Sequence, residues 1–161
     1  MNPNDNPTRS RRDRLLKPET HDPYRRDRKL HDPTVCPDCT AVFRDGRWTW
    51  AAGPADAPRV RCPACARTAD GYAAGFVSVR GLFAPEQRRE LENLLRNVEA
   101  EQKRAHPLKR ILDTADSEGG IEIRTTDGHL ARDLGAALKR AFGGDLEVDY
   151  AEDLVRVAWT R

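Results

Sequence analysis

Four cysteines in two closely spaced pairs are the residues of this chain best suited to chemistry. Both pairs have the form Cys-Pro-x-Cys, and 22 residues separate them, which gives the set Cys36, Cys39, Cys62 and Cys65. Two tight turns of this kind can offer four thiolates to one ion in the tetrahedral arrangement of structural zinc sites. Four protein ligands leave no open position for water or substrate. The sequence therefore predicts one structural Zn²⁺ held by these cysteines.

Other interpretations of the cysteines explain less of the pattern. Two dithiol redox pairs or unligated core thiols would account neither for the repeated proline nor for the matched spacing. A histidine ligand, His31 or His129, is not needed beside four cysteines. Glycine often follows the second cysteine of such a pair, because a positive φ lets backbone N–H groups reach the sulfurs, but Thr40 and Ala66 stand there. We expect the local geometry to be strained or different.

Arginine and tryptophan are concentrated in and around the segment between the two cysteine pairs. The residues concerned are Arg44, Arg47, Trp48, Trp50, Arg59, Arg61 and Arg67. Guanidinium groups can contact phosphates and indole rings can stack on unpaired bases, so this combination is typical of an RNA-binding surface. The structural interpretation is that the tryptophans form the core of a small ribbon and the arginines its solvated rim. The sequence leaves both interpretations open.

Enzyme motifs are missing from the sequence. It has no P-loop, no H-E-x-x-H, no G-x-S-x-G and no glycine-rich dinucleotide fingerprint. His129 could in principle act as a general base, but a capping histidine at a helix start is the simpler interpretation. We therefore expect no enzyme, no catalytic residue and no small-molecule substrate.

Charge is distributed unevenly along the 161 residues. Residues 1–67 contain fourteen basic and nine acidic side chains, whereas residues 68–161 contain fourteen basic and seventeen acidic ones. A polyanion is therefore expected at the basic N-terminal part. No apolar run approaches the length of a membrane span, and no apolar segment follows the first arginines. We expect a soluble, unexported protein without membrane association, whose thiols stay reduced in a bacterial-type cytoplasm.

The chain divides into three predicted parts. Residues 1–34 hold five of the eleven prolines and no apolar periodicity, which predicts a disordered basic arm that either orders on RNA or only aids solubility. Residues 35–70 form the zinc ribbon, in which Asp45-Gly46 predicts a hairpin turn. Residues 71–161 have the apolar patterning of an α+β domain.

The order of elements in the third part is predicted to be βαββαββ. Alternating apolar residues predict the strands, and apolar residues at helical spacing predict two helices. Pro85 and His106-Pro107 bound the first helix, and Gly143-Gly144 ends the second. A turn is expected over 116–120. Either Thr126 or Asp127 can cap the second helix. The expected segments are strand 76–82, helix 85–105, strands 111–112 and 121–125, a helix ending before 143, and strands 146–150 and 155–159. An open, antiparallel-rich sheet with both helices on one face, similar to a ferredoxin-like fold with an added strand, is the simplest packing; a different mixed sheet is the alternative.

Short motifs distributed over most of the chain resemble an uncharacterised family of small bacterial zinc-ribbon proteins. They are H-D-P-Y at 21–24, P-T-V-C-P-D-C at 33–39, A-V-F at 41–43, G-R-W-T-W at 46–50, D-G-Y-A-A-G-F at 70–76, H-P-L-K-R-I at 106–111, T-T-D-G-H-L-A-R at 125–132 and V-R-V-A-W at 155–159. A cysteine ribbon followed by an α+β domain with T-T-D-x-H-L-A-R also resembles the N-terminal region of the archaeal and eukaryotic adaptor for large-ribosomal-subunit export. That resemblance implies ribosome or rRNA binding. The adaptor has more cysteine knuckles and a separate export-signal region, so its transport role is not implied.

The sequence thus predicts a zinc-stabilised RNA-binding or ribosome-associated protein whose partner is the ribosome or rRNA. The alternative is a zinc-ribbon adaptor that docks another protein through a sheet edge or the acidic C-terminal domain, with no part for RNA.

Overall fold

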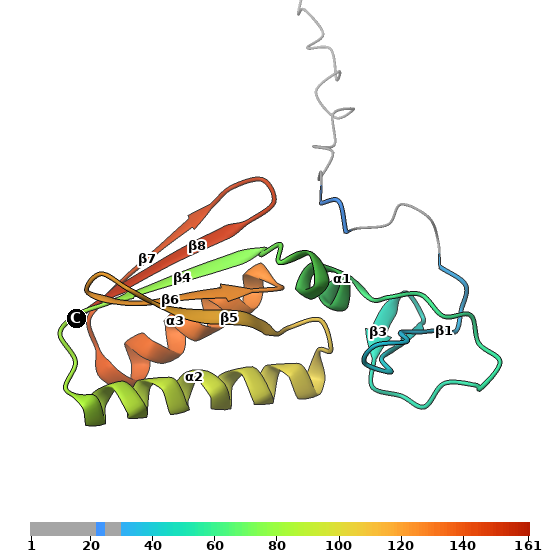
Figure 1. The fold of residues 1–161 in the computed structure, drawn as a ribbon, viewed down its shortest axis with the longest axis horizontal. Coiled ribbons are helices and arrows are strands. Elements are labelled where there is room, and N and C mark those ends of the chain that lie inside the picture. The colour runs from blue at the N-terminus through green and yellow to red at the C-terminus, as the bar shows by residue number, and fades with distance from the viewer. Residues whose placement is uncertain (1–21, 25–29) are drawn as a thin grey trace, which may run out of the picture.

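The computed structural model describes residues 22–24 and 30–161, and within them it contains two sheets and three helices. A small cysteine-bearing unit lies beside a larger layered domain in Figure 1. The predicted class is confirmed: a zinc ribbon precedes an α+β domain whose elements follow the order βαββαββ. Most of the predicted arm, residues 1–34, lies outside the described residues. In the part of the chain that the structure describes, no helix combines the length and the apolarity needed to cross a bilayer.

The ribbon is built on a small antiparallel sheet. Its strands are β1 (Thr34–Val35), β2 (Val42–Arg44) and β3 (Arg47–Thr49). The predicted turn joins β2 to β3, and both of its residues have positive φ, 52° at Asp45 and 78° at Gly46, as a tight two-residue hairpin requires.

The second cysteine pair lies at the start of a helix that the sequence pattern did not predict. Helix α1 (Pro63–Asp70) begins with proline in its first turn, and Cys62 is its N-cap residue. The Cys62 sulfur accepts the Cys65 backbone N–H at 3.4 Å. The pattern Cys-Pro-x-Cys predicts a second tight turn, whereas in the structure its cysteines lie around the first helical turn.

The α+β domain has one five-stranded sheet and two helices. Its elements are β4 (Gly75–Arg80), α2 (Pro85–Ala105), β5 (Ile111–Ser117), β6 (Gly120–Thr125), α3 (Gly128–Phe142), β7 (Asp145–Tyr150) and β8 (Val155–Thr160). The strand order is β5-β6-β4-β8-β7. Strand β8 pairs in parallel with β4, and the other pairs are antiparallel. The strand added to the ferredoxin-like pattern therefore lies inside the sheet, between β4 and β7.

Both helices cover one face of this sheet, as Figure 1 shows. The core between the layers contains Val77, Leu91, Ile123 and Leu134, which are all almost fully buried. Trp159 is also fully buried, and its indole N–H donates to the carbonyl of Gly143 at 2.8 Å, at the C-terminus of α3. This core is independent of the cysteines.

Local signals account for most of the element boundaries. Helix α2 begins at Pro85 and ends before His106, as predicted, and Asp127 caps α3 by accepting the Leu130 N–H at 3.0 Å. Strand β5 is longer than predicted, because it continues to Ser117 and the turn to β6 is only two residues long. The turn predicted over 116–120 is therefore too wide.

Candidate metal centre

The four predicted zinc ligands meet at one point of the structure. Their sulfur atoms all lie within 4.8 Å of one another, and all four cysteines are free thiols. The sulfurs of Cys39 and Cys62 are 3.8 Å apart. Tetrahedral zinc with Zn–S bonds of about 2.3 Å places its sulfurs about 3.8 Å apart, so donor type and spacing both fit one structural Zn²⁺.

The first cysteine pair is positioned by a closed turn between β1 and β2. The Cys36 backbone N–H donates to the carbonyl of Ala41 at 2.8 Å, and the Thr40 N–H donates to the carbonyl of Cys36 at 3.0 Å. Thr40 has a φ of +66°, so the positive-φ position expected after the second cysteine exists but carries a β-branched residue. Ala66, after the second pair, lies in α1 and needs no such conformation.

Each of the four sulfurs accepts an N–H group. Backbone N–H groups serve two of them, from Cys62 to the Cys36 sulfur at 3.3 Å and from Cys65 to the Cys62 sulfur at 3.4 Å. The guanidinium of Arg110 serves the other two, donating to the Cys39 sulfur at 3.1 Å and the Cys65 sulfur at 3.2 Å. The α+β domain thus contributes directly to the surroundings of the metal centre.

These contacts shift the acidity of the groups involved. Burial lowers the pKa of Arg110, but its hydrogen bonds to Cys39 and Cys65 outweigh burial and raise the pKa overall, so the guanidinium stays charged. Burial raises the pKa of the Cys39 thiol, but the Ala41 backbone N–H and Arg110 outweigh it and lower that pKa to about 7. Burial raises the pKa of Cys62 and Cys65. Zinc binds thiolates, so loading the site releases protons.

The two tryptophans of the ribbon both have structural contacts. Trp48 packs against the cysteine cluster and against Phe43, with ring centroids 5.7 Å apart. Trp50 is 40% exposed, but its indole N–H donates to the carbonyl of Lys103 at 2.7 Å, in the last turn of α2. Trp50 therefore links the ribbon to the α+β domain.

The arginines predicted as nucleic-acid contacts separate into two groups. Arg44 and Arg47 face each other across the hairpin turn. Arg59 and Arg61 are exposed on the loop before the second cysteine pair, and Arg61 pairs with Asp38 at 2.5 Å. Arg67, on α1, is only 3% exposed. The structure thus exposes Arg47, Arg59 and Arg61, leaves Arg44 half-buried and buries Arg67.

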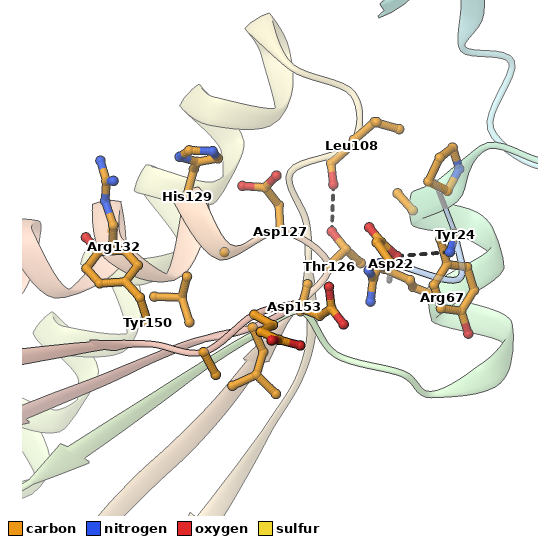
Figure 2. Close-up of a pocket in the computed structure, with 18 residues that line it drawn as sticks. Asp22, Tyr24, Arg67, Leu108, Thr126, Asp127, His129, Arg132, Tyr150 and Asp153 are labelled. Carbon is orange, nitrogen blue, oxygen red and sulfur yellow. Dashed lines mark hydrogen bonds and ion pairs between the residues drawn. The ribbon is translucent and has the colours of Figure 1, made fainter. Parts of the chain in front are cut away.

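The partners of Arg67 come from a short segment far away in the sequence. Asp22 pairs with the Arg67 guanidinium at 2.7 Å, and the Tyr24 ring lies over it at 4.5 Å. The Tyr24 hydroxyl donates to the carboxylate of Asp70, also on α1, at 2.7 Å. Figure 2 shows Asp22 and Tyr24 against Arg67. We call residues 22–24 the arm anchor; the H-D-P-Y motif was its only sequence signal, and the motif did not identify the partner.

A cavity of about 520 Å³ lies between the arm anchor, α1, the start of α3 and the β7–β8 turn. In Figure 2, His129, Arg132 and Tyr150 lie at the end away from Arg67. His129 is exposed in the first turn of α3, and among the described residues the metal-binding group consists of the four cysteines without a histidine.

Comparison of the chain with known protein families, curated proteins and solved structures found no match.

Proposed function

We propose that this protein is a zinc-stabilised RNA-binding protein that associates with the ribosome and has no catalytic activity. The observation that carries the proposal is the pair of arginines at the tip of the hairpin. Arg44 and Arg47 lie opposite each other, and within residues 22–24 and 30–161 neither forms an ion pair with a carboxylate. Two such guanidinium groups on neighbouring strands suit the phosphates of an RNA backbone.

The metal gives this surface a fixed shape. A short hairpin is only marginally stable alone in water, and the ribbon has few apolar side chains to hold it. Bound zinc stabilises the fold of such small units. The proposed RNA contacts are Arg44, Arg47, Arg59 and Arg61. Arg67 and Trp48 are packed within the protein and the Trp50 indole is hydrogen-bonded to Lys103, whereas Arg61 pairs with Asp38 but keeps half of its side chain exposed.

We propose the ribosome as the partner because of the motif resemblance to the large-subunit export adaptor, which implies ribosome or rRNA binding. That adaptor acts on ribosomal particles, and the basic N-terminal part of this chain suits rRNA. We accordingly propose a cytoplasmic, bacterial protein that contacts a ribosomal subunit through its zinc ribbon.

The test compares two double variants of equal charge. Arg44→Gln with Arg47→Gln removes the charge of the hairpin tip, whereas Arg89→Gln with Arg140→Gln removes two exposed arginines of α2 and α3. Fluorescence anisotropy with a short single-stranded RNA should show at least tenfold weaker binding for the hairpin variant alone. Its log affinity should also depend less steeply on log salt, by roughly one for each phosphate that an arginine no longer neutralises.

Sucrose gradients of cell extracts provide the second measurement. The wild-type protein should sediment with ribosomal subunits or whole ribosomes, and the hairpin variant should move to the free fraction with its zinc content unchanged. If the wild-type protein stays entirely in the free fraction, both during growth and under stress, ribosome association is wrong. Equal RNA affinities for the two variants would exclude the hairpin as the contact surface.

A protein-docking adaptor is the second candidate, and edge strand β7 favours it. Val148 and Tyr150 are exposed large side chains on this strand, and Asp145, Glu147 and Asp149 alternate with them. An exposed strand edge can pair with a strand of another protein. Affinity isolation with nuclease in high salt separates the candidates, because protein partners that remain bound would support the adaptor and their complete loss would support RNA.

A further inference from the structure

The loop that joins α2 to β5 reaches the metal centre from the α+β domain. Leu108 packs against the cysteine cluster, and Arg110 donates to the sulfurs of Cys39 and Cys65. The two hydrogen bonds of Arg110 reach cysteines that lie 71 and 45 positions before it in the sequence. Within the described residues, Arg110 is the only N–H donor to the Cys65 sulfur. No described residue of the ribbon replaces this donor.

Charge explains why an arginine suits this position. Four thiolates around Zn²⁺ carry a net charge of −2, and two of the cysteines here, Cys36 and Cys62, have no exposed surface. A buried charge is costly unless it is paired and hydrogen-bonded. Arg110 supplies one positive charge and two N–H groups in a planar fork that spans two sulfurs. Lysine, a point charge, would not reproduce that geometry.

Contacts within the protein, independent of the metal, hold the guanidinium of Arg110 in place. Its backbone N–H donates to the Thr126 hydroxyl at 2.9 Å, and its carbonyl accepts the Thr126 N–H at 2.9 Å. Its Nε donates to the carbonyl of Pro107 at 2.8 Å, and the ring of Trp50 lies 5.9 Å from the guanidinium carbon. Its two terminal nitrogens are therefore directed at the sulfurs by fixed neighbours.

We propose that Arg110 is a positioning residue for the zinc centre, and that the negative charge of the loaded centre holds the ribbon on the α+β domain. Loss of the metal then releases the ribbon while the α+β domain stays folded. RNA plays no part in this inference, so it stands or falls separately from the proposed function.

Two tryptophans report the two events separately. The indole N–H of Trp50 is bonded to Lys103 across the junction between ribbon and domain, whereas that of Trp159 is bonded to Gly143 inside the domain. Indole N–H exchange, followed by NMR, therefore distinguishes release of the ribbon from unfolding. When a chelator removes zinc from the wild-type protein, exchange at Trp50 should accelerate at least tenfold and exchange at Trp159 should not change.

The variant Arg110→Gln tests the residue itself, with Arg104→Gln as control. Arg104 is an exposed residue at the end of α2, close to the same loop. Arg110→Gln should still bind one zinc ion, but with a dissociation constant about 10 to 100 times higher, as is typical when a group that supports a ligand is removed. Its Trp50 indole should exchange faster in the loaded protein. Arg104→Gln should match the wild type in both respects.

The conservative variant Arg110→Lys keeps the test decisive if the glutamine variant does not fold. Its zinc affinity should lie between those of the wild type and Arg110→Gln, because lysine keeps the positive charge but cannot donate to both sulfurs in one plane. Wild-type zinc affinity in whichever of these variants folds would overturn the proposal. So would unchanged protection of the Trp50 indole after the wild-type protein has lost its zinc.

Discussion

Thr40 adopts a left-handed backbone conformation, with φ +66°, at the end of the turn that carries the first two cysteines. For a residue with a Cβ this conformation costs roughly 1–2 kcal/mol, whereas glycine adopts it freely. The turn is nevertheless closed by backbone hydrogen bonds on both sides of the residue. The surrounding structure therefore imposes the strain.

Replacing Thr40 by glycine should raise the free energy of unfolding of the zinc-loaded protein by about 1 kcal/mol, because relief of strain outweighs the added freedom of the unfolded chain. Urea unfolding at saturating zinc measures the change. Ala66→Gly is the matched control, since it follows the second cysteine pair but lies within α1. It should lower the free energy of unfolding by about 1 kcal/mol. Changes of the same sign in both variants would contradict this account.

The sequence revealed the metal ligands but not the groups that support them. Four cysteines in two matched pairs can be recognised as metal ligands from the sequence alone, because residue type and spacing are both local features. Arg110 and the Asp22–Arg67 pair act across 71 and 45 residues, and no local signal marks such contacts. The sequence also did not show whether Trp50 is a core or a surface residue, because its hydrogen-bond partner at the end of α2 is distant in the sequence.

At the scale of elements, the bounds of helix α2 could be predicted from the sequence, whereas the order of the strands in the sheet could not. The bounds of α2 follow from proline signals at both ends, so they could be predicted. The position of β8 between β4 and β7 depends on pairing between distant segments, which alternation of apolar residues does not specify. Helix α1 was missed because it has only eight residues and because its first residues belong to the Cys-Pro-x-Cys pattern, which predicts a tight turn.

The hairpin of β5 and β6 carries an ion pair between Asp113 and Arg124, on neighbouring positions of the two strands. Hydrogen bonding to Arg124 lowers the pKa of the Asp113 carboxyl below its ordinary value. A carboxyl with a lowered pKa stabilises the folded state above its unfolded pKa of about 3.9, and this contribution is lost as the pH falls through the folded value.

Asp113→Asn should therefore lower the melting temperature slightly at pH 7 and leave it unchanged once the pH is below the folded pKa. The side chains are 38% and 44% exposed, so the free-energy difference at pH 7 should be less than about 1 kcal/mol. Melting curves across this pH range measure it. In an Arg124→Gln background the substitution should have no effect at either pH; an equal effect in both backgrounds would rule out the pair as the cause.

At the scale of the whole molecule, two folding units depend on different interactions. The ribbon has a small cluster around its cysteines, whereas the α+β domain has a large apolar core. A structural zinc ion supplies much of the folding free energy of a small unit of this kind. A unit of about ninety residues with its own core can fold without it.

Zinc removal should consequently unfold the ribbon and α1 while α2, α3 and the five-stranded sheet persist. Far-ultraviolet circular dichroism should lose only a small part of its helical signal. Limited proteolysis should cut between residues 30 and 70 and leave residues 71–161 intact. Collapse of the whole helical signal on chelation would show that the two units are one cooperative structure.

The arm anchor also bears on how shortened forms of this protein should be made. A fragment beginning at residue 30 would keep all four cysteines and every strand of the described chain, and by motif alone it would look complete. It would nevertheless lack Asp22 and Tyr24, so the guanidinium of Arg67 would lose both its carboxylate partner and the ring that lies over it. Expression fragments should therefore begin before Asp22, and affinity tags or fusion partners should be attached ahead of it, so that the pair between Asp22 and the buried Arg67 stays intact.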